Sequence, residues 1–163
     1  MTLTLISHNA DETQAIGARL AELLQPNDVL LLSGDLGAGK TEFTQGVAKG
    51  LGIEEPVNSP TFNLLLTHPL PAATTDMPHA LYHFDLYRLD DSEQLTDIDY
   101  FGMLEDGAVA LVEWGDRFSD ALPVDYLLIE IAILSENLRQ LTFSAVGEQS
   151  LARLRTWHDN HDR

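Results

Sequence analysis

The sequence predicts a single α/β domain over residues 1–163, in which helices cover a mainly parallel sheet in three layers and an antiparallel hairpin extends that sheet. Three observations lead to this fold class. Strand-like and helix-like segments alternate along the chain. The apolar run at residues 29–33 is continuous, as in strands that are buried on both faces. The length suits one domain with one sizeable core.

The first third of the chain contains two predicted pairs of a strand and a helix. Residues 3–6 predict a short strand, and residues 9–24 predict a helix with Asn9 as its N-cap. Residues 29–33 are the buried strand. A glycine-rich loop then leads into a helix over about residues 41–51. The GLG run at residues 50–52 predicts the end of this helix.

The remainder of the chain predicts mostly strands. Residues 59–68 and 80–89 predict the antiparallel hairpin, and the proline-containing linker between them is longer than a hairpin needs. Three later runs predict further strands: residues 108–114, 125–134 and 139–147, the last at an edge of the sheet. A closing helix carries its apolar residues on one packing stripe. About the last six residues are expected to form a loose tail.

The charge balance argues against direct binding of nucleic acid. The chain has 26 acidic residues against nine lysines and arginines, a net charge of −17, and only two lysines, Lys40 and Lys49. Because affinity for nucleic acid depends on clustered cations, we expect no strong direct binding of tRNA, and any link to RNA should pass through a protein partner.

Composition also bears on location and metal chemistry. The absence of cysteine excludes disulfides and thiolate metal sites. No apolar run approaches the roughly 18 residues of a membrane span, and the N-terminus lacks a secretory pattern. The expectation from the sequence is therefore a soluble, cytoplasmic protein with no membrane partner.

The loop at residues 34–41, GDLGAGKT, matches the phosphate-binding pattern G-x-x-x-x-G-K-[ST] in full. Glycines let main-chain N–H groups converge on phosphate oxygens, the lysine adds a point charge, and the threonine hydroxyl can ligate Mg²⁺. A buried strand before the loop and a helix after it favour this interpretation over an incidental glycine-rich turn. The residues predicted to bind ATP here are Gly34, Asp35, Leu36, Gly37, Ala38, Gly39, Lys40 and Thr41.

Magnesium requires a second protein anchor, and two acids qualify. Asp85 and Glu113 each follow an apolar strand, where ligands of open α/β sheets collect. We predict that both take part in metal binding and catalysis together with Lys40. Thr61, stiffened by Pro60, is a candidate to reach the metal or the γ-phosphate. ATP is the expected nucleotide, because no lysine after Lys49 is available for the N-K-x-D guanine motif.

Four segments in this order and spacing, GDLGAGKT, NSPTFNL, HFDLYRL and LVEWGDR, resemble the bacterial TsaE (YjeE) family, the ATPase component of tRNA threonylcarbamoyladenosine biosynthesis. The resemblance implies a small P-loop ATPase that uses ATP and Mg²⁺ and hydrolyses ATP slowly by itself. It also implies two protein partners, TsaB and TsaD, which place a threonylcarbamoyl group on the adenosine beside the tRNA anticodon.

The resemblance further implies roles for individual residues. Lys40 contacts phosphate, Thr41 and Glu113 bind Mg²⁺, and Asp85 takes the place of the Walker B acid. Thr13 and Arg139 match weaker family positions near the nucleoside. The partner-sensitive positions are Ser59, Pro60, Thr61 and Phe62 of the switch-like segment, and Trp114. Glu42 departs from the family, which often has a small or neutral residue there, and its side chain is expected to point away from the site.

The mechanistic hypothesis is hydrolysis of Mg²⁺-ATP by water, with ATP binding ordering the SPTF segment and the hairpin against the partners. His83 is predicted to be a hydrogen-bonded structural histidine rather than a catalytic base. Two alternatives remain open. A small-molecule kinase would phosphorylate a metabolite without partners, and a nucleotide-binding adaptor would keep its role after Thr41→Ala or Asp85→Ala.

Overall fold

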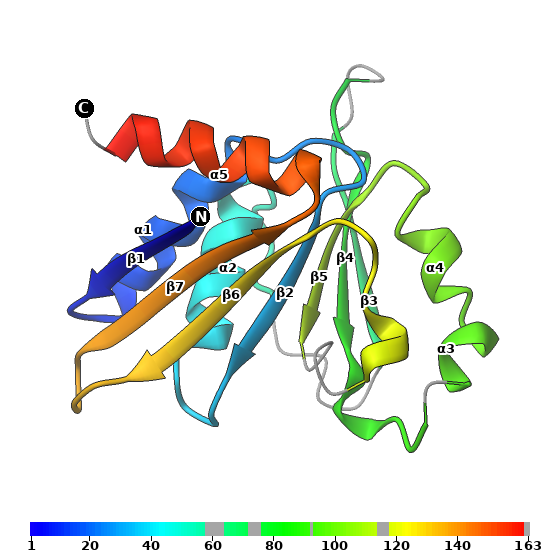
Figure 1. The fold of residues 1–163 in the computed structure, drawn as a ribbon, viewed down its shortest axis with the longest axis horizontal. Helices are drawn as coiled ribbons and strands as arrows, with labels where there is room; N and C mark the ends of the chain where they lie inside the picture. The colour runs from blue at the N-terminus through cyan, green and yellow to red at the C-terminus, as the bar shows by residue number, and fades with distance from the viewer. Residues whose placement is uncertain (58–63, 72–75, 92, 114–117, 162–163) are drawn as a thin grey trace.

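A seven-stranded sheet runs through the computed structural model (Figure 1). The structure describes residues 1–57, 64–71, 76–91, 93–113 and 118–161. The strands are β1 (Thr2–Ser7), β2 (Val29–Gly34), β3 (Leu65–Pro69), β4 (Ala80–Asp85), β5 (Val109–Glu113), β6 (Tyr126–Ile133) and β7 (Arg139–Val146). Their spatial order is β1-β7-β6-β2-β5-β4-β3.

The centre of the sheet is parallel, and both of its sides are antiparallel. Strands β6, β2, β5 and β4 pair in parallel, whereas β3 pairs antiparallel with β4. The predicted α/β class, the mainly parallel sheet and the hairpin are therefore confirmed. The prediction of β7 as an edge strand is wrong, because β1 returns to pair with it and β7 lies between β1 and β6.

Helices cover both faces of the sheet. On one face lie α1 (Ala10–Ala21), α2 (Lys40–Gly50) and α5 (Glu148–His161), and on the other lie η1 (Leu86–Arg88), α3 (Gln94–Asp97), α4 (Tyr100–Met103) and η3 (Ser119–Ala121). Strand β2 shows why both faces are covered. Its Leu30 and Leu32 belong to the core under α1, α2 and α5, while Val29 and Leu31 belong to the opposite core.

The carboxyl ends of the four parallel strands meet at one edge of the sheet. Figure 1 shows the arrowheads of β2, β4, β5 and β6 at this edge, next to the loop that connects β2 to α2. The end of β3 and the start of β4 lie at the opposite edge, where the main-chain N–H of Leu70 donates to the carbonyl of His79 at 2.9 Å. Leu70 and His79 therefore lie at the opposite edge from the phosphate loop, and the response of the hairpin to ATP stays a prediction.

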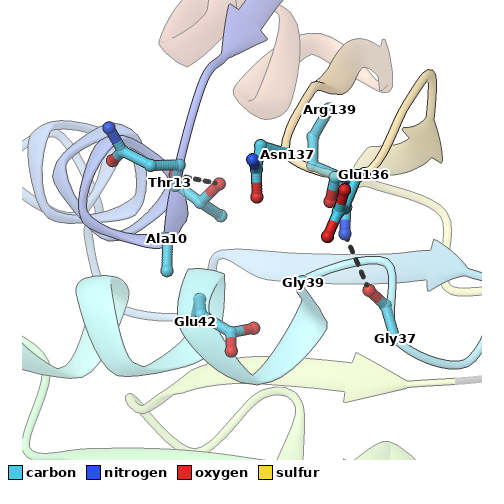
Figure 2. Close-up of a pocket in the computed structure, with 9 residues that line it drawn as sticks. Ala10, Thr13, Gly37, Gly39, Glu42, Glu136, Asn137 and Arg139 are labelled. Atoms are coloured by element: carbon cyan, nitrogen blue, oxygen red, sulfur yellow. Dashed lines mark hydrogen bonds between the residues drawn. The ribbon is translucent and has the colours of Figure 1, made fainter.

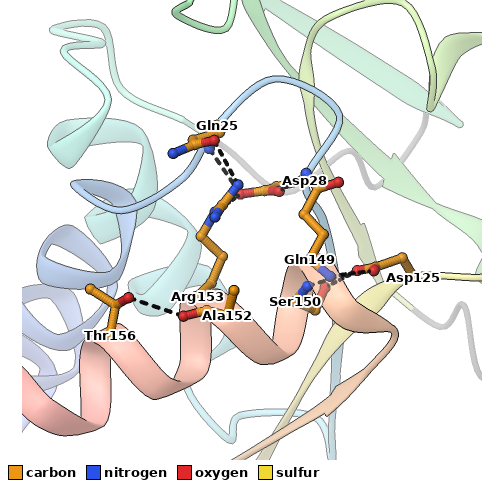
Figure 3. Close-up of polar contacts among 8 residues, drawn as sticks. All are labelled: Gln25, Asp28, Asp125, Gln149, Ser150, Ala152, Arg153 and Thr156. Atoms are coloured by element: carbon orange, nitrogen blue, oxygen red, sulfur yellow. Dashed lines mark hydrogen bonds and ion pairs between the residues drawn. The ribbon is translucent and has the colours of Figure 1, made fainter.

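Two buried or half-buried acids fix α5 to the sheet (Figure 3). Asp125 accepts hydrogen bonds from the main-chain N–H groups of Gln149 and Ser150 at 2.8 and 2.9 Å, and so caps the start of α5. Asp28 accepts an ion-paired hydrogen bond from Arg153 Nε at 3.0 Å and one from Gln149 Nε2 at 2.5 Å. The acids therefore bind the closing helix at two points.

The closing helix is longer than expected at its end. It continues to His161, so residues 158–161 are helical and not part of a loose tail. Trp157 anchors this last part, because its ring packs edge-on against Phe143 of β7 with centroids 4.6 Å apart. Within the described ranges, no helix combines the length and the apolar character that crossing a membrane requires.

Candidate nucleotide-binding site

The loop between β2 and α2 has the backbone shape that phosphate binding requires. Gly37 and Gly39 adopt left-handed conformations, with φ of +81° and +109°. A Cβ on Gly37 would meet no atom within 4 Å, so the backbone conformation and not crowding explains this glycine. Gly39 is the N-cap of α2 and gives its first turn no side-chain hydrogen bond. The N–H groups of that turn thus have no cap from Gly39 and can face an anion.

Lys40 and Thr41 are the first two residues of α2, directly after this glycine. The Lys40 side chain is partly exposed, and Thr41 is exposed. Burial raises the pKa of Asp85, and the positive charge of Lys40 is among the groups that offset part of this rise, so Lys40 lies within electrostatic reach of this strand-end acid. The predicted phosphate lysine and the predicted acids therefore belong to one site.

Arg139 ties the loop to the start of β7. Its Nε donates to the carbonyl of Ala38 at 3.1 Å. Its Nη2 donates to the carbonyl of Gly37 at 3.3 Å, the bond drawn in Figure 2. Its Nη1 donates to the carbonyl of Ser135 at 2.8 Å, in the turn that joins β6 to β7. The guanidinium thus bonds main-chain carbonyls on both sides and holds the phosphate loop against this turn.

A pocket opens beside the loop, and its walls come from three parts of the chain. Helix α1 supplies one wall, the phosphate loop and α2 the floor, and the turn between β6 and β7 the other wall (Figure 2). The lining residues are Asn9, Ala10, Thr13, Gly37, Gly39, Glu42, Glu136, Asn137 and Arg139. Both weaker family positions, Thr13 and Arg139, are among them.

Thr13 lines this pocket as a buried side chain whose hydroxyl is already hydrogen-bonded elsewhere. Only 2% of its surface is exposed, and its hydroxyl lies 2.7 Å from Ser7 Oγ at the end of β1. Its Cγ2 lies 3.8 Å from the place that a Cβ on Gly39 would take. The hydroxyl therefore holds α1 to β1, while the methyl group faces the phosphate loop.

Glu42 lies in the pocket, so the expectation that it points away is wrong. Its Oε2 is 3.8 Å from the position of a Cβ built on Gly39. Side chains of a helix lean towards its N-terminus, and Glu42 is about one turn after Gly39, so its carboxylate lies back over the loop. A negative charge is therefore present next to the predicted phosphate site.

The two predicted metal ligands lie side by side. Asp85 ends β4, Glu113 ends β5, and the two are direct partners in the parallel register. Burial raises the pKa of Asp85, and the charge of Glu113 adds to this, while the Tyr87 N–H, His83 and Lys40 lower it. The site thus holds two carboxylates that repel each other and that a cation would bring together.

Glu113 forms a buried pair with His83. The distance from His83 Nε2 to Glu113 Oε2 is 2.7 Å, and the two side chains are 2% and 8% exposed. This confirms the prediction that His83 is hydrogen-bonded. Its other ring nitrogen, Nδ1, is buried and has no hydrogen-bond partner within the described part of the chain.

The oxygen donors at this site fit a magnesium ion that a bound nucleotide also coordinates. They fit less well a metal ion that protein side chains alone coordinate. The described residues contain no group of three or more His, Asp or Glu side chains arranged to hold a metal ion. Two adjacent carboxylates and a threonine hydroxyl are the oxygen donors that Mg²⁺ uses when substrate phosphates complete its shell. The residues present therefore fit Mg²⁺ bound together with a nucleotide.

Some of the residues predicted for this site are brought together in the structure, and others cannot be placed. Ser59, Pro60, Thr61, Phe62 and Trp114 lie outside the described residues. The pocket residues that no motif marked are Asn9, Ala10, Glu136 and Asn137. They come from a helix start and a turn, and only the folded arrangement of α1 and the β6–β7 turn brings them to the loop.

Known proteins similar to this chain agree with one another. The family model described as "Threonylcarbamoyl adenosine biosynthesis protein TsaE" matches residues 7–141. The "tRNA threonylcarbamoyladenosine biosynthesis protein TsaE" of Bacillus subtilis is 43% identical over 155 residues, which cover 93% of this chain and 92% of the relative. The protein of the same name from Treponema pallidum is 36% identical over 137 residues, covering 84% and 96%. A crystal structure of YdiB from Bacillus subtilis aligns with a TM-score of 0.80 and 34% identity, covering 100% of this chain and 97% of that one.

Proposed function

Because the chain belongs to the TsaE family, we propose that it is a Mg²⁺-dependent ATPase that serves tRNA threonylcarbamoyladenosine biosynthesis. The single observation that supports ATP binding most strongly is the arrangement at one sheet edge. There the left-handed Gly37 and Gly39 precede the first turn of α2, and Asp85 and Glu113 end the neighbouring strands. This is the geometry that phosphoryl-transfer sites use to hold a nucleotide and a divalent cation.

The site residues have separate parts in the proposed reaction. Main-chain N–H groups at the start of α2 hold the phosphate oxygens, and Lys40 balances their charge. Thr41, Asp85 and Glu113 hold Mg²⁺, which, when bound, neutralises charge that develops on the phosphates. Arg139 keeps the loop in shape through its bonds to Gly37 and Ala38. Catalysis then comes from positioning and charge stabilisation of an attack by water on the γ-phosphate.

We propose that hydrolysis by the isolated chain is slow and that protein partners complete the reaction. A chain with a net charge of −17 is a poor ligand for tRNA, so the tRNA should be bound by partners of the TsaB and TsaD type. The switch-like segment at Ser59–Phe62 and Trp114 are the proposed contacts that report the bound nucleotide to these partners.

The test is a comparison of the wild-type chain with Lys40→Ala and Thr41→Ala. We expect calorimetry to detect ATP binding to the wild type with Mg²⁺, and ATP hydrolysis to rise when both partner proteins are added. Formation of threonylcarbamoyladenosine on tRNA should require the wild-type chain. Undiminished tRNA modification by both variants would leave only an adaptor role, and phosphorylation of a metabolite without partners would identify a kinase instead.

A further inference from the structure

We infer that His83 is a positioning residue that holds the Glu113 carboxylate in the orientation in which it binds the metal. This inference rests on the proposed function, because Glu113 must act in the site for its orientation to matter. The observation behind it is the buried hydrogen bond of 2.7 Å between His83 Nε2 and Glu113 Oε2.

The sheet register brings these two residues together. His83 is the partner of Leu111 across the β4–β5 pair, and Asp85 is the partner of Glu113. Alternation along each strand puts His83, Asp85 and Glu113 on the same face, the one covered by α2. His83 is thus one step behind the two acids, farther from the open edge and deeper in the sheet.

The hydrogen bond restricts a side chain that is otherwise mobile. A glutamate has three side-chain torsions, so a carboxylate at a strand end can occupy several rotamers. A carboxylate only accepts hydrogen bonds, so His83 Nε2 carries the hydrogen in this pair. The ring of His83, on a buried strand, therefore fixes one of the two carboxylate oxygens of Glu113.

Packing alone does not explain a histidine here. Leu81, two residues earlier on the same face, is a fully buried leucine, which is the usual choice for this environment. Burying an imidazole is unfavourable unless its nitrogens are bonded, and within the described residues Nδ1 has no partner. The buried Nδ1 is therefore unfavourable for stability, whereas Nε2 makes the bond to Glu113 that a leucine could not make.

The experiment compares His83→Leu with His83→Gln. Leucine keeps much of the volume but removes the donor, whereas glutamine keeps an N–H donor near the position of Nε2. Residues that orient metal ligands through hydrogen bonds typically change metal affinity or activity by about 10- to 100-fold when lost. We expect a fall of this size in His83→Leu, both in the Mg²⁺ dependence of ATP binding and in partner-stimulated turnover. Binding of ATP in EDTA should stay within about twofold, and His83→Gln should recover most of the loss.

His68→Leu is the matched control. His68 lies on β3, on the same face, and its Nε2 is also buried without a partner in the described part of the chain, but it bonds no carboxylate. We expect its turnover and Mg²⁺ dependence to match the wild type. Thermal unfolding of each variant shows that the assays compare folded proteins.

A nuclear magnetic resonance measurement tests the pair even if no ATPase activity is found. Long-range ¹H–¹⁵N spectra should show His83 with its hydrogen on Nε2, and Glu113→Gln should shift that signal. A hydrogen on Nδ1 alone would overturn the inference, as would equal losses in His83→Leu and His83→Gln, or wild-type Mg²⁺ dependence in His83→Leu. Failure of the wild type to bind ATP would instead overturn the proposed function, and the spectra would still decide whether His83 holds Glu113.

Discussion

Replacing Arg139 with alanine tests whether this residue acts on the phosphate loop or on the nucleoside. In the structure its guanidinium bonds the carbonyls of Gly37 and Ala38, although the family resemblance places it near the nucleoside. The substitution removes both bonds and frees the loop from the β6–β7 turn. We expect the helix start to lose its preorganised shape, so that nucleotide binding must first order the loop.

The size of the effect follows from the two lost bonds. A hydrogen bond from a charged donor contributes about 1.5 to 3 kcal/mol, and the bond to Gly37 is long at 3.3 Å, so the loop loses about 3 kcal/mol in all. The same bonds are also present in the protein without nucleotide. The affinity therefore changes only by the free energy needed to order the loop again when the nucleotide binds. We therefore expect binding to weaken by about 10- to 100-fold, which corresponds to about 1.4 to 2.7 kcal/mol.

The assay is calorimetry with two ligands, ATP and inorganic tripolyphosphate, each with Mg²⁺. If Arg139 shapes the loop, both ligands weaken by the same factor, because both use the loop. If it contacts the nucleoside, only ATP weakens. Arg155→Ala, at an exposed position of α5, is the matched control and should leave both affinities unchanged. Tripolyphosphate affinity within twofold of the wild type in a folded Arg139→Ala protein would refute the reasoning.

Three further predictions concern charge, stability and pH. Glu42→Gln removes the carboxylate beside the loop, so calorimetry should show ATP binding strengthened about threefold at low salt and less at high salt; an unchanged affinity would mean that Glu42 is too far from the phosphates to repel them. Asp28→Ala leaves Arg153 and Gln149 without their buried acceptor, so thermal unfolding should show a loss of about 3 kcal/mol, or about 6 to 12 °C. The exposed Asp97→Ala is its control, and equal melting temperatures for the two would contradict it. Burial, aided by the nearby charge of His83, lowers the pKa of His68 below its usual 6.5. The unfolded chain therefore takes up a proton that the folded chain resists, stability falls as pH drops below about 6.5, and His68→Gln should flatten this fall between urea midpoints at pH 8 and pH 5. Parallel pH profiles would contradict the assignment.

The sequence was most informative where local chemistry determines structure. The shape of the loop after β2 was predictable because its glycines, lysine and threonine each meet a separate backbone or charge requirement within eight positions, and Gly37 and Gly39 do adopt left-handed conformations. Asn9 was correctly placed as an N-cap, and its side chain accepts from the Glu12 N–H at 2.8 Å. That Asp85 and Glu113 lie close together was predictable because strand ends in parallel sheets gather at one edge, and the register places them next to each other.

The parts that were missed depend on contacts between distant segments. Nothing local in residues 139–147 reveals that β1 pairs with them, so the strand looked like an edge. Likewise, the turn residues Glu136 and Asn137 line the pocket because the sheet brings the turn between β6 and β7 next to the loop, to which Arg139 bonds it. The position of Glu42 was predictable in principle, since the lean of helical side chains is general, but it needed the loop geometry as a reference.

The distribution of charge makes the cation an integral part of the proposed site. Asp85, Glu113 and Glu42 bring three carboxylates to the site. Against them stand Lys40 and Arg139, and the Arg139 guanidinium is already engaged by main-chain carbonyls. ATP adds further negative charge, so binding without a divalent ion must overcome repulsion that Lys40 and the first turn of α2 offset only in part. Mg²⁺ reverses this balance, because the two strand-end acids then attract the complex. On this reasoning Asp85 and Glu113 make ATP binding depend on Mg²⁺ more than they strengthen ATP binding itself. In EDTA, neutralising either acid should therefore strengthen ATP binding.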